Sequence, residues 1–510
     1  AWIENGNLVV DGRPTLRRNI YADNWMHGKC FTERYAADLK NFWKTSECET
    51  YYCIGPSKVI PGLSRKEAIF DVAPCAEYLA RLDALVDEYM KTDFIAYYIY
   101  DEPECSGISP IYLKHVYDHV AERDPYHPIF SATRGGKTYI ECVDWAETHP
   151  YLDCRVPDEN GVRTYGTAPN EVGRFLDAFE AWDRPDKCIG FLPTCFAYRY
   201  TSSGCDYPTF DEYVLHTWAA MMRGGKSLWP YGGQDLGDRP ALYEGTKYIF
   251  SSFAALETIV LFGKRTTFAK SEQEEGVLYT LPDEKMFVIV NFTARPRAVV
   301  LPKGCGTFRE FRGKRMYEAG GTVELAPFET IVGCSKDHDG EVPSRDDVRS
   351  LALRQEAERK GRDNQLRGRY DDLVVDSNMT PNHGGGFYKL IDGTRDFLAR
   401  FSSCKTNSYI EVACPKSKAR FSIARVWGHN VGSLEVDVRK RGEWRTLTPK
   451  SVKRERWMTE LDFGEPVETV KVRFRFPMPP GRNEIEVYEL ELPWCKARSL
   501  DSQAAREAAA

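Results

Sequence analysis

Residues 94–104, FIAYYIYDEPE, place three carboxylates directly behind an uninterrupted apolar and aromatic run. Such a run is typical of a strand buried on both faces, as in parallel sheets, and Pro103 bars further strand pairing. Asp101 and Glu102 therefore follow the end of a buried strand, where carboxyl groups are suited to general acid–base chemistry. Glu104 has a simpler interpretation as a cap of the next helix.

Carboxylates, a histidine and aromatic rings also follow or end the other expected strands. These candidate residues are Asp23, Trp25, Trp145, Glu147, His149, Tyr151, Tyr198, Trp229, Tyr231 and Asp235. Carboxylates among indole and phenol rings suit a sugar, whose C–H faces stack on aromatic rings while its hydroxyls need polar partners. A phosphate substrate would favour glycine-rich loops or clustered arginines, and neither is evident. The predicted partner is a glycan.

The elements that must position these residues alternate between strand and helix up to residue 262. Segments 75–91, 169–183 and 210–225 have helical periodicity, and short apolar runs lie between the helical segments. Strand and helix repeated in this way predict a parallel sheet, and no Gly-x-Gly-x-x-Gly supports a dinucleotide-binding alternative. Seven strands are clear and the second or third is blurred at 55–74. We expect a (β/α)8 TIM barrel over residues 1–262.

The pattern changes to period-two alternation after residue 262. Residues 263–335 predict a small antiparallel β-sandwich, and the charge-dense stretch 336–370 an exposed linker helix. Residues 371–494 predict a second all-β unit, followed by a polar, alanine-rich tail at 495–510. The chain is therefore expected to be multidomain.

The composition of the 510 residues is that of a globular protein, with 42% hydrophobic and 28% charged residues and a formal net charge of -6. This balance lacks the excess of positive charge that is typical of nucleic-acid-binding proteins. No stretch of the sequence approaches the ~20 consecutive apolar residues of a membrane-spanning helix. The chain begins at Ala1 without methionine, as a mature secreted protein or a trimmed chain would. We expect a secreted or periplasmic protein. The sequence does not predict an oligomeric state.

Fifteen cysteines occur without a Cys-x-x-Cys pair, and no His/Asp/Glu cluster has metal spacing. We expect no catalytic metal or cofactor. Close pairs such as Cys48 with Cys53, or Cys188 with Cys195, are possible disulfides in an oxidising compartment. The alternative is that most cysteines are small buried hydrophobic residues.

The order of several motifs resembles a known family. YYIYDEPE, DPYHP (124–128), DWAETHPY, GGKSLWPYGG and FAALETI (253–259) together resemble the catalytic barrel of clan A glycoside hydrolases and their relatives with a DEP motif, over roughly residues 8–335. LIDGTRDFLARFSS (390–403), SYIEVAC and ARFSIARVWGHN are similar to discoidin-type, galactose-binding-like carbohydrate-binding modules. The second resemblance implies a β-sandwich that can carry a structural calcium.

The first resemblance implies roles for two carboxylates. Clan A places its acid/base glutamate at the end of the fourth strand after a polar residue, usually Asn; Glu102 matches the glutamate and Asp101 replaces the Asn. Glu102 is then expected to protonate the glycosidic oxygen, its pKa raised by the aromatic mouth or by Asp101. The seventh-strand nucleophile is missing from residues 187–200, which contain no Asp or Glu.

The second carboxylate is therefore open between Glu147, which we favour, and Asp235. A separation of ~5 Å between the two carboxyl groups would allow a covalent intermediate, and ~6.5–9.5 Å would leave room for water and inversion. The sequence predicts a glycoside hydrolase acting on an oligo- or polysaccharide. A non-catalytic carbohydrate-binding protein on a degenerate barrel is the alternative.

Overall fold

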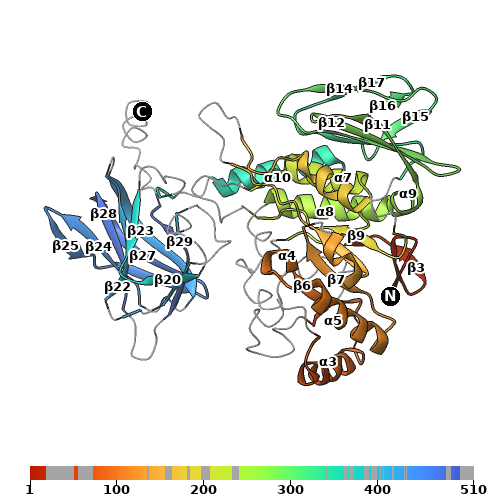
Figure 1. Ribbon diagram of the computed structural model, residues 1–510. Coiled ribbons are helices and arrows are strands. Elements are labelled where there is room, and N and C mark those ends of the chain that lie inside the picture. Colours follow the sequence, from red (N-terminus) through yellow and green to blue (C-terminus); the bar gives the residue numbers. More distant parts are fainter. Residues whose placement is uncertain are drawn as a thin grey trace, which may run out of the picture. The chain divides into compact units, whose positions relative to one another are not determined.

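The protein is described by a computed structural model (Figure 1). It describes residues 1–18, 51–54, 73–92, 94–134, 137–155, 163–180, 184–196, 207–231, 240–338, 343–360, 364–366, 373–383, 390–391, 399–402, 404–405, 407–415, 418–429, 431, 433–477 and 484–493. The described residues divide into two compact units, one up to Arg354 and the other from Gln355.

The first unit is built on a parallel sheet of seven described strands. They are β4 (Arg17–Arg18), β5 (Tyr51–Cys53), β6 (Ala96–Asp101), β7 (Ile129–Thr133), β8 (Trp145–Thr148), β9 (Cys188–Phe191) and β10 (Ser227–Leu228). Their order is β4-β10-β9-β8-β7-β6-β5, so the last strand pairs with the first. The expected parallel sheet is confirmed as a half-barrel. The eight-stranded closed barrel stays a prediction. Strand β6 is the third of the described parallel strands, and residues 55–72, which hold most of the blurred strand expected at 55–74, lie outside the described residues.

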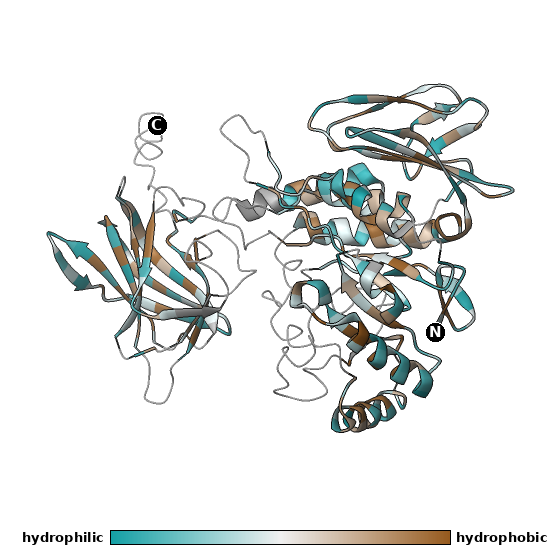
Figure 2. Ribbon diagram, in the orientation of Figure 1, coloured by the Kyte–Doolittle hydropathy of each residue, from teal (hydrophilic) through white to brown (hydrophobic). Residues whose placement is uncertain are grey.

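Helices connect and cover these strands. They are α3 (Ala76–Tyr89), α4 (Pro103–Ser106), α5 (Pro110–Arg123), η3 (Lys137–Cys142), α6 (Glu171–Glu180), α7 (Phe210–Met222), α8 (Pro240–Ala255) and α9 (Glu257–Phe262). Helix α7 begins with a capping box, in which the Thr209 side chain accepts from the Glu212 backbone N–H and Glu212 accepts in return. Figure 2 shows hydrophilic and hydrophobic residues alternating along the helices, as expected for helices packed on one face.

Two clusters of buried side chains lie on the two faces of the parallel sheet. One gathers Tyr97, Ile99 and Ile129 with side chains of α3 and α5. The other fills the inside of the half-barrel and includes Phe130 and Trp145. It also takes in residues from the small antiparallel sheet of β1 (Trp2–Glu4), β2 (Asn7–Val10) and β3 (Arg13–Thr15). The inside is a packed core, not a pore.

An antiparallel sandwich follows the half-barrel, as the sequence predicts. Its strands are β11 (Lys264–Lys270), β12 (Glu274–Thr280), β13 (Lys285–Asn291), β14 (Arg297–Val300), β15 (Thr307–Glu310), β16 (Met316–Glu318), β17 (Thr322–Leu325) and β18 (Thr330–Cys334). They form a six-stranded and a two-stranded sheet. Side chains of β12, β13 and β18 join those of α7, α8 and α9 in one buried cluster, so half-barrel and sandwich share a core.

Helix α10 (Arg345–Lys360) differs from the expected exposed linker. Val348 and Ala352, four residues apart, are buried against the first unit. Arg349 donates to Asp211 of α7 at 2.7 Å, and Arg345 binds the same carboxylate. Two apolar residues at helical spacing are enough to anchor the helix despite its charged composition.

The second unit is an all-β sandwich, as expected. Its strands are β19 (Val374–Ser377), β20 (Thr380–His383), β21 (Ala399–Ser402), β22 (Ser408–Ala413), β23 (Ala419–His429), β24 (Glu435–Lys440), β25 (Glu443–Thr446), β26 (Ser451–Glu455), β27 (Met458–Thr469), β28 (Lys471–Phe476) and β29 (Ile485–Glu491). They form sheets of five and six strands, β19-β22-β28-β24-β25 and β20-β21-β29-β23-β27-β26. Phe421, Val426 and Phe474 belong to the buried core of the unit.

Eight of the ten free cysteines in the described part of the chain are buried, as expected for small hydrophobic residues, and Cys75 and Cys105 are exposed. Cys188 and Cys195 are buried free thiols, so the possible disulfide between them does not form. Cys48 lies outside the described residues. Within the described part of the chain, no helix is long and apolar enough to span a membrane.

Candidate active site

Glu102 stands at the junction of β6 and α4 in a left-handed backbone conformation, with φ 44° and ψ 62°. A residue with a side chain adopts this conformation only where its surroundings impose it. Here the Glu102 N–H donates to the carbonyl of Ala132 at 3.0 Å, and its own carbonyl accepts from Cys105 at 3.0 Å. The strained residue is thus fixed between the neighbouring strand and the short helix, with its side chain 31% exposed.

A β-bulge turns the end of β6. The pairing of β6 with β7 shifts register between Tyr98 and Tyr100. Without the shift, Asp101 would point to the face opposite Tyr98, because side chains alternate along a strand. The Tyr98 hydroxyl instead donates to the exposed Asp101 carboxylate at 2.8 Å. The bulge therefore brings Asp101 onto the same face as Tyr98, which belongs to the interior cluster.

His149 and Arg134 hold the Glu102 carboxylate. His149, two residues beyond the buried Glu147 of β8, lies with Nε2 2.7 Å from Glu102 Oε1. Arg134 Nε donates to the same oxygen at 3.3 Å. The His149 hydrogen bond lowers the pKa of Glu102 to about 2, with the charges of His149 and Arg134 acting in the same direction. The expected rise of this pKa is wrong, because hydrogen-bond donors outweigh the effect of burial.

Glu104 joins the end of β7 to α4. It accepts from the Thr133 hydroxyl and from the Arg134 backbone N–H at 3.1 Å. No side-chain cap bond is made at the start of α4. The expected helix-capping role of Glu104 is therefore wrong, because its carboxylate instead secures the neighbouring strand end and the backbone of Arg134.

Glu147 is a buried acid inside the half-barrel. Its partner in the register on β9 is Gly190, where an added Cβ would overlap the Glu147 carboxyl group and the Ser227 hydroxyl. The Ser227 hydroxyl donates to Glu147 and itself accepts from Trp145 Nε1 at 2.9 Å. Burial raises the pKa of Glu147 to about 8, so its neutral form dominates at pH 7. Among the described residues, Glu147 Oε2 has no hydrogen-bond partner.

A group of aromatic rings continues from His149. The ring of Tyr151 lies 4.9 Å from His149 and stacks on Tyr231 at 5.4 Å. Phe196 meets both tyrosines edge-on, at 4.9 and 5.3 Å. Tyr151 and Tyr231 are partly exposed. Tyr151 therefore joins His149 to a small aromatic group in which two rings are partly exposed.

Two of the three candidate tryptophans lie in the interior of the half-barrel. Trp145 and Trp229 are 0% exposed and pack on each other at 5.3 Å in the interior cluster. Their rings have no face open to a ligand, because both side chains point into the core of the half-barrel. Asp23, Trp25, Tyr198 and Asp235 lie outside the described residues.

Sequence reasoning missed two residues of this site. Arg134 is the last residue of the predicted strand segment 128–134. A charged residue at the end of a parallel strand could therefore have identified it as a candidate site residue. Ser227 gave no signal, because a serine in a short apolar strand has no distinctive pattern. Its role depends on the pairing of β10 beside β9 and on the space left by Gly190.

Comparisons with known proteins give weak similarities. No protein-family model and no curated protein matches the sequence. Among solved structures, AmyP in complex with maltose is 12% identical and covers 53% of this chain and 69% of its own, with a TM-score of 0.35. The alpha-amylase of Geobacillus thermoleovorans in complex with acarbose is 12% identical and covers 51% and 64%, with a TM-score of 0.33.

A carbohydrate-binding module is also similar. The family 32 module of C. perfringens NanJ in complex with galactose is 11% identical and covers 24% of this chain and 93% of its own, with a TM-score of 0.21. Amylase-type glycoside hydrolases and carbohydrate-binding modules are thus among the structures that the chain resembles. With TM-scores below 0.5, none of these similarities assigns an activity or a residue role to this chain.

Proposed function

We propose that this protein hydrolyses a glycosidic bond in an oligo- or polysaccharide, with Glu102 as the general acid/base. The observation that carries the proposal is the Glu102–His149 pair, a strained and partly exposed carboxylate hydrogen-bonded at 2.7 Å to a histidine whose side chain is 4% exposed. The stacked Tyr151 and Tyr231 beside it give a sugar ring an aromatic surface. Carboxyl groups and water suffice for this chemistry, so we propose no cofactor.

The resting protonation state of Glu102 favours the base half of its role. As an ionised carboxylate it takes a proton from water, while the water oxygen bonds to the anomeric carbon and the bond to the leaving oxygen breaks. The leaving oxygen needs a proton from a second acid. His149 orients the Glu102 carboxylate, and Asp101, fixed by Tyr98, is placed to bind a sugar hydroxyl.

Glu147 and Asp235 remain the candidates for the second carboxyl group. Glu147 has the protonation state of an acid, since its pKa is about 8. However, it is 1% exposed, so in this conformation it reaches no substrate. Glu147→Gln and Asp235→Asn separate the two: loss of turnover with unchanged binding identifies the second carboxyl group.

The test is sugar release from a panel of aryl glycosides and natural oligosaccharides by the wild type and Glu102→Gln. We expect release by the wild type and a loss of at least about 100-fold in the variant. Asp118→Asn, an exposed carboxylate on the outer helix α5, is the matched control and should retain full activity. The anomer of the first product, followed by NMR, distinguishes retention from inversion.

One observation favours a second function, a carbohydrate-binding protein without turnover. In the described part of the chain, the end of β9 and the residues after it, Phe191–Phe196, supply no carboxylate to the site. Binding of a panel member with no sugar release by either protein would support this alternative and contradict the hydrolase.

A further inference from the structure

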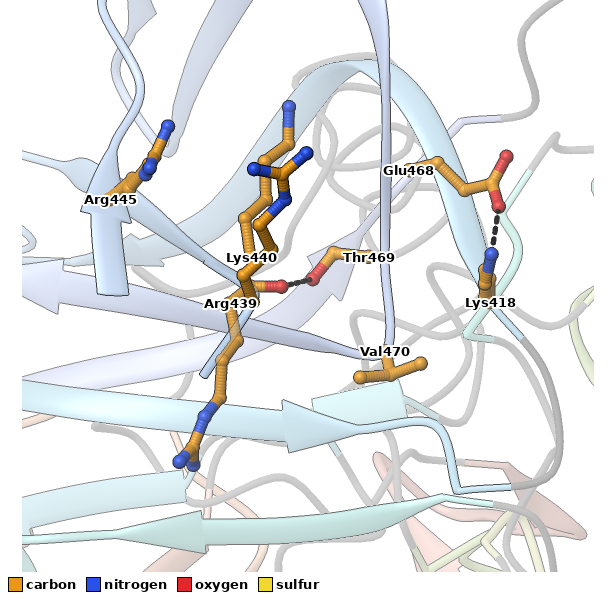
Figure 3. A pocket seen from close by; sticks show the side chains of 8 residues that line it. Lys418, Arg439, Lys440, Arg445, Glu468, Thr469 and Val470 are labelled. Carbon is orange, nitrogen blue, oxygen red and sulfur yellow. Dashed lines mark hydrogen bonds and ion pairs between the residues drawn. The ribbon is translucent and has the colours of Figure 1, made fainter. Parts of the chain in front are cut away.

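The second unit carries a basic pocket at one end of its sandwich. It has a volume of about 540 Å³ and is shown in Figure 3. Eight residues line it: Lys418, Arg439, Lys440, Arg441, Arg445, Glu468, Thr469 and Val470. Five of these residues are cationic and one, Glu468, carries a carboxylate. The whole chain has a formal net charge of -6, so this concentration of positive charge is a local feature.

A tight hairpin brings three of the cations together. Strands β24 and β25 are joined at Arg441 and Gly442, which have φ values of 52° and 87°. Two successive left-handed residues are typical of a two-residue hairpin turn. Lys440 and Arg445 fall on the same face of the hairpin in its register, and Figure 3 shows their side chains extending in the same direction. The hairpin therefore presents Lys440, Arg441 and Arg445 around one turn.

The turn after β27 forms the opposite wall. The Thr469 hydroxyl donates to the carbonyl of Arg439 at 3.1 Å, which ties this wall to the hairpin. Arg439 itself points away from Lys440 in Figure 3, and its guanidinium lies 5.9 Å from the ring of Trp444. Backbone structure and one hydrogen bond thus fix the two walls relative to each other.

The charges of the hairpin are not neutralised within the described residues. Glu468 is occupied by Lys418, with Nζ 2.8 Å from Oε1. Glu443 faces Lys440 in the register, but it does not line the pocket. No ion pair joins Lys440, Arg441 or Arg445 to another described residue. Exposed like charges on one turn repel each other, and an anion bound between them removes that repulsion.

We propose that this pocket binds the acidic groups of an anionic polysaccharide, either carboxylated or sulfated. Guanidinium groups match the two oxygens of a carboxylate or sulfate, and the ammonium of Lys440 adds a point charge. The lining contains no aromatic ring on which nucleic acid bases or neutral sugars could stack. Val470 is its one apolar side chain, too little to anchor a membrane.

The choice of a polysaccharide over an acidic peptide rests on the proposed glycan hydrolysis. The pocket would then hold the chain on an acidic polymer while the site of the first unit acts on it. Binding is independent of turnover, so it is measured with Glu102→Gln, in which hydrolysis is blocked. Failure of the hydrolase proposal and failure of this one are thereby distinguishable.

The experiment measures the affinity of the full chain, by calorimetry at low salt, for four polymers: polygalacturonate, dextran sulfate, neutral dextran and a short DNA duplex. We expect binding to polygalacturonate or dextran sulfate, no binding to dextran, and binding to DNA at least about tenfold weaker. Raising the salt concentration should weaken the interaction, because it is electrostatic.

The variant Lys440→Gln/Arg441→Asn/Arg445→Gln should bind at least about tenfold more weakly, since it loses three cations. Asn is used at residue 441 because it tolerates the left-handed conformation. The matched control, Lys450→Gln/Lys453→Gln/Arg454→Gln, removes three exposed cations of the same unit that do not line the pocket. Three outcomes contradict the proposal. The two triple variants could lose the same affinity for the acidic polysaccharide, DNA could bind as tightly as the polysaccharide or more tightly, or neither acidic polysaccharide could bind.

Discussion

Glu102 and Glu147 lie two strands apart in the parallel sheet, and their surroundings shift their pKa values in opposite directions. Donors from His149 and Arg134 lower the pKa of Glu102 to about 2, whereas burial raises that of Glu147 to about 8. Between these two pKa values, Glu102 is therefore mostly ionised and Glu147 mostly neutral. Opposed protonation states are the arrangement that acid–base hydrolysis requires, although Glu147 is closed off from the surface.

The role of His149 is tested by His149→Phe. The change removes the hydrogen bond that most lowers the pKa of Glu102, so this pKa rises towards its ordinary value of 4.5. If ionised Glu102 is the base, activity is lost as pH falls through its pKa. The acidic limb of kcat/KM against pH should therefore move to higher pH. Tyr151→Phe keeps the ring and the His149 hydrogen bond, and its acidic limb should not move.

Burial of Glu147 predicts a pH-dependent stability. Below pH 4.5 the group is protonated in both states, and its ionisation does not affect the free energy of unfolding. Between pH 4.5 and about 8 the unfolded chain releases the proton and the folded chain keeps it, so the free energy of unfolding falls as pH rises. Glu147→Gln should be more stable than the wild type at pH 8, by on the order of a few kcal/mol.

Denaturant unfolding at pH 4.5 and pH 8 measures this difference. The gain from Glu147→Gln should be small at pH 4.5 and grow with pH. A gain of the same size at both pH values would show that Glu147 is not held neutral in the folded protein.

At the scale of the element, the pairing of β8, β9 and β10 creates the space for Glu147. Gly190 faces Glu147 on one side and Ser227 on the other, and its missing side chain leaves room for their hydrogen bond. The β-bulge in β6 has a similar function for Asp101. Both features depend on how strands pair, and neither is visible in the sequence of a single strand.

Gly190→Ala should destabilise the protein by roughly 1–3 kcal/mol, because the added methyl group overlaps two side chains in a packed interior. In a Ser227→Ala background one of these overlaps is gone, so the same change should cost less. Chemical denaturation of the four proteins in this cycle measures the coupling. Equal costs in both backgrounds would mean that Gly190 does not contact Ser227 as described.

At the scale of the whole molecule, the two units have separate buried cores. The first extends from the helices α7–α9 into the small sandwich and includes the anchored start of α10, and the second belongs to the C-terminal sandwich. Units with their own cores are expected to unfold independently unless a large interface joins them.

Calorimetry should therefore show two unfolding transitions. Phe253→Ala removes a fully buried ring from the first unit, and Phe421→Ala removes one from the second. Each should lower one transition only, through a loss of about 3–5 kcal/mol in the unit concerned. A single transition shifted by both variants would contradict two independent units.

The sequence predicted the alternation of parallel strands and helices, the switch to antiparallel strands after residue 262, and Glu102 at a strand end, because burial and side-chain periodicity are local properties. It did not predict the lowered pKa of Glu102, which depends on His149 and Arg134 from two neighbouring strands. The sequence also predicted Trp145 and Trp229 as site residues, and this was wrong. An aromatic residue near the end of a strand has the same sequence pattern whether it lines a binding site or packs in the core beneath that site. Helix α10 was predicted to be exposed because most of its residues are charged. Its two buried residues, Val348 and Ala352, are too few to change that composition.

The most direct test of the account is the initial rate of sugar release by Glu102→Ala with and without added formate. The variant should be inactive on substrates that the wild type cleaves, and formate, a small carboxylate that fits the vacated space, should restore part of the rate. Formate should not raise the rate of Asp101→Ala, since we do not propose Asp101 as the base. Full activity of Glu102→Ala without formate would contradict the central role of Glu102.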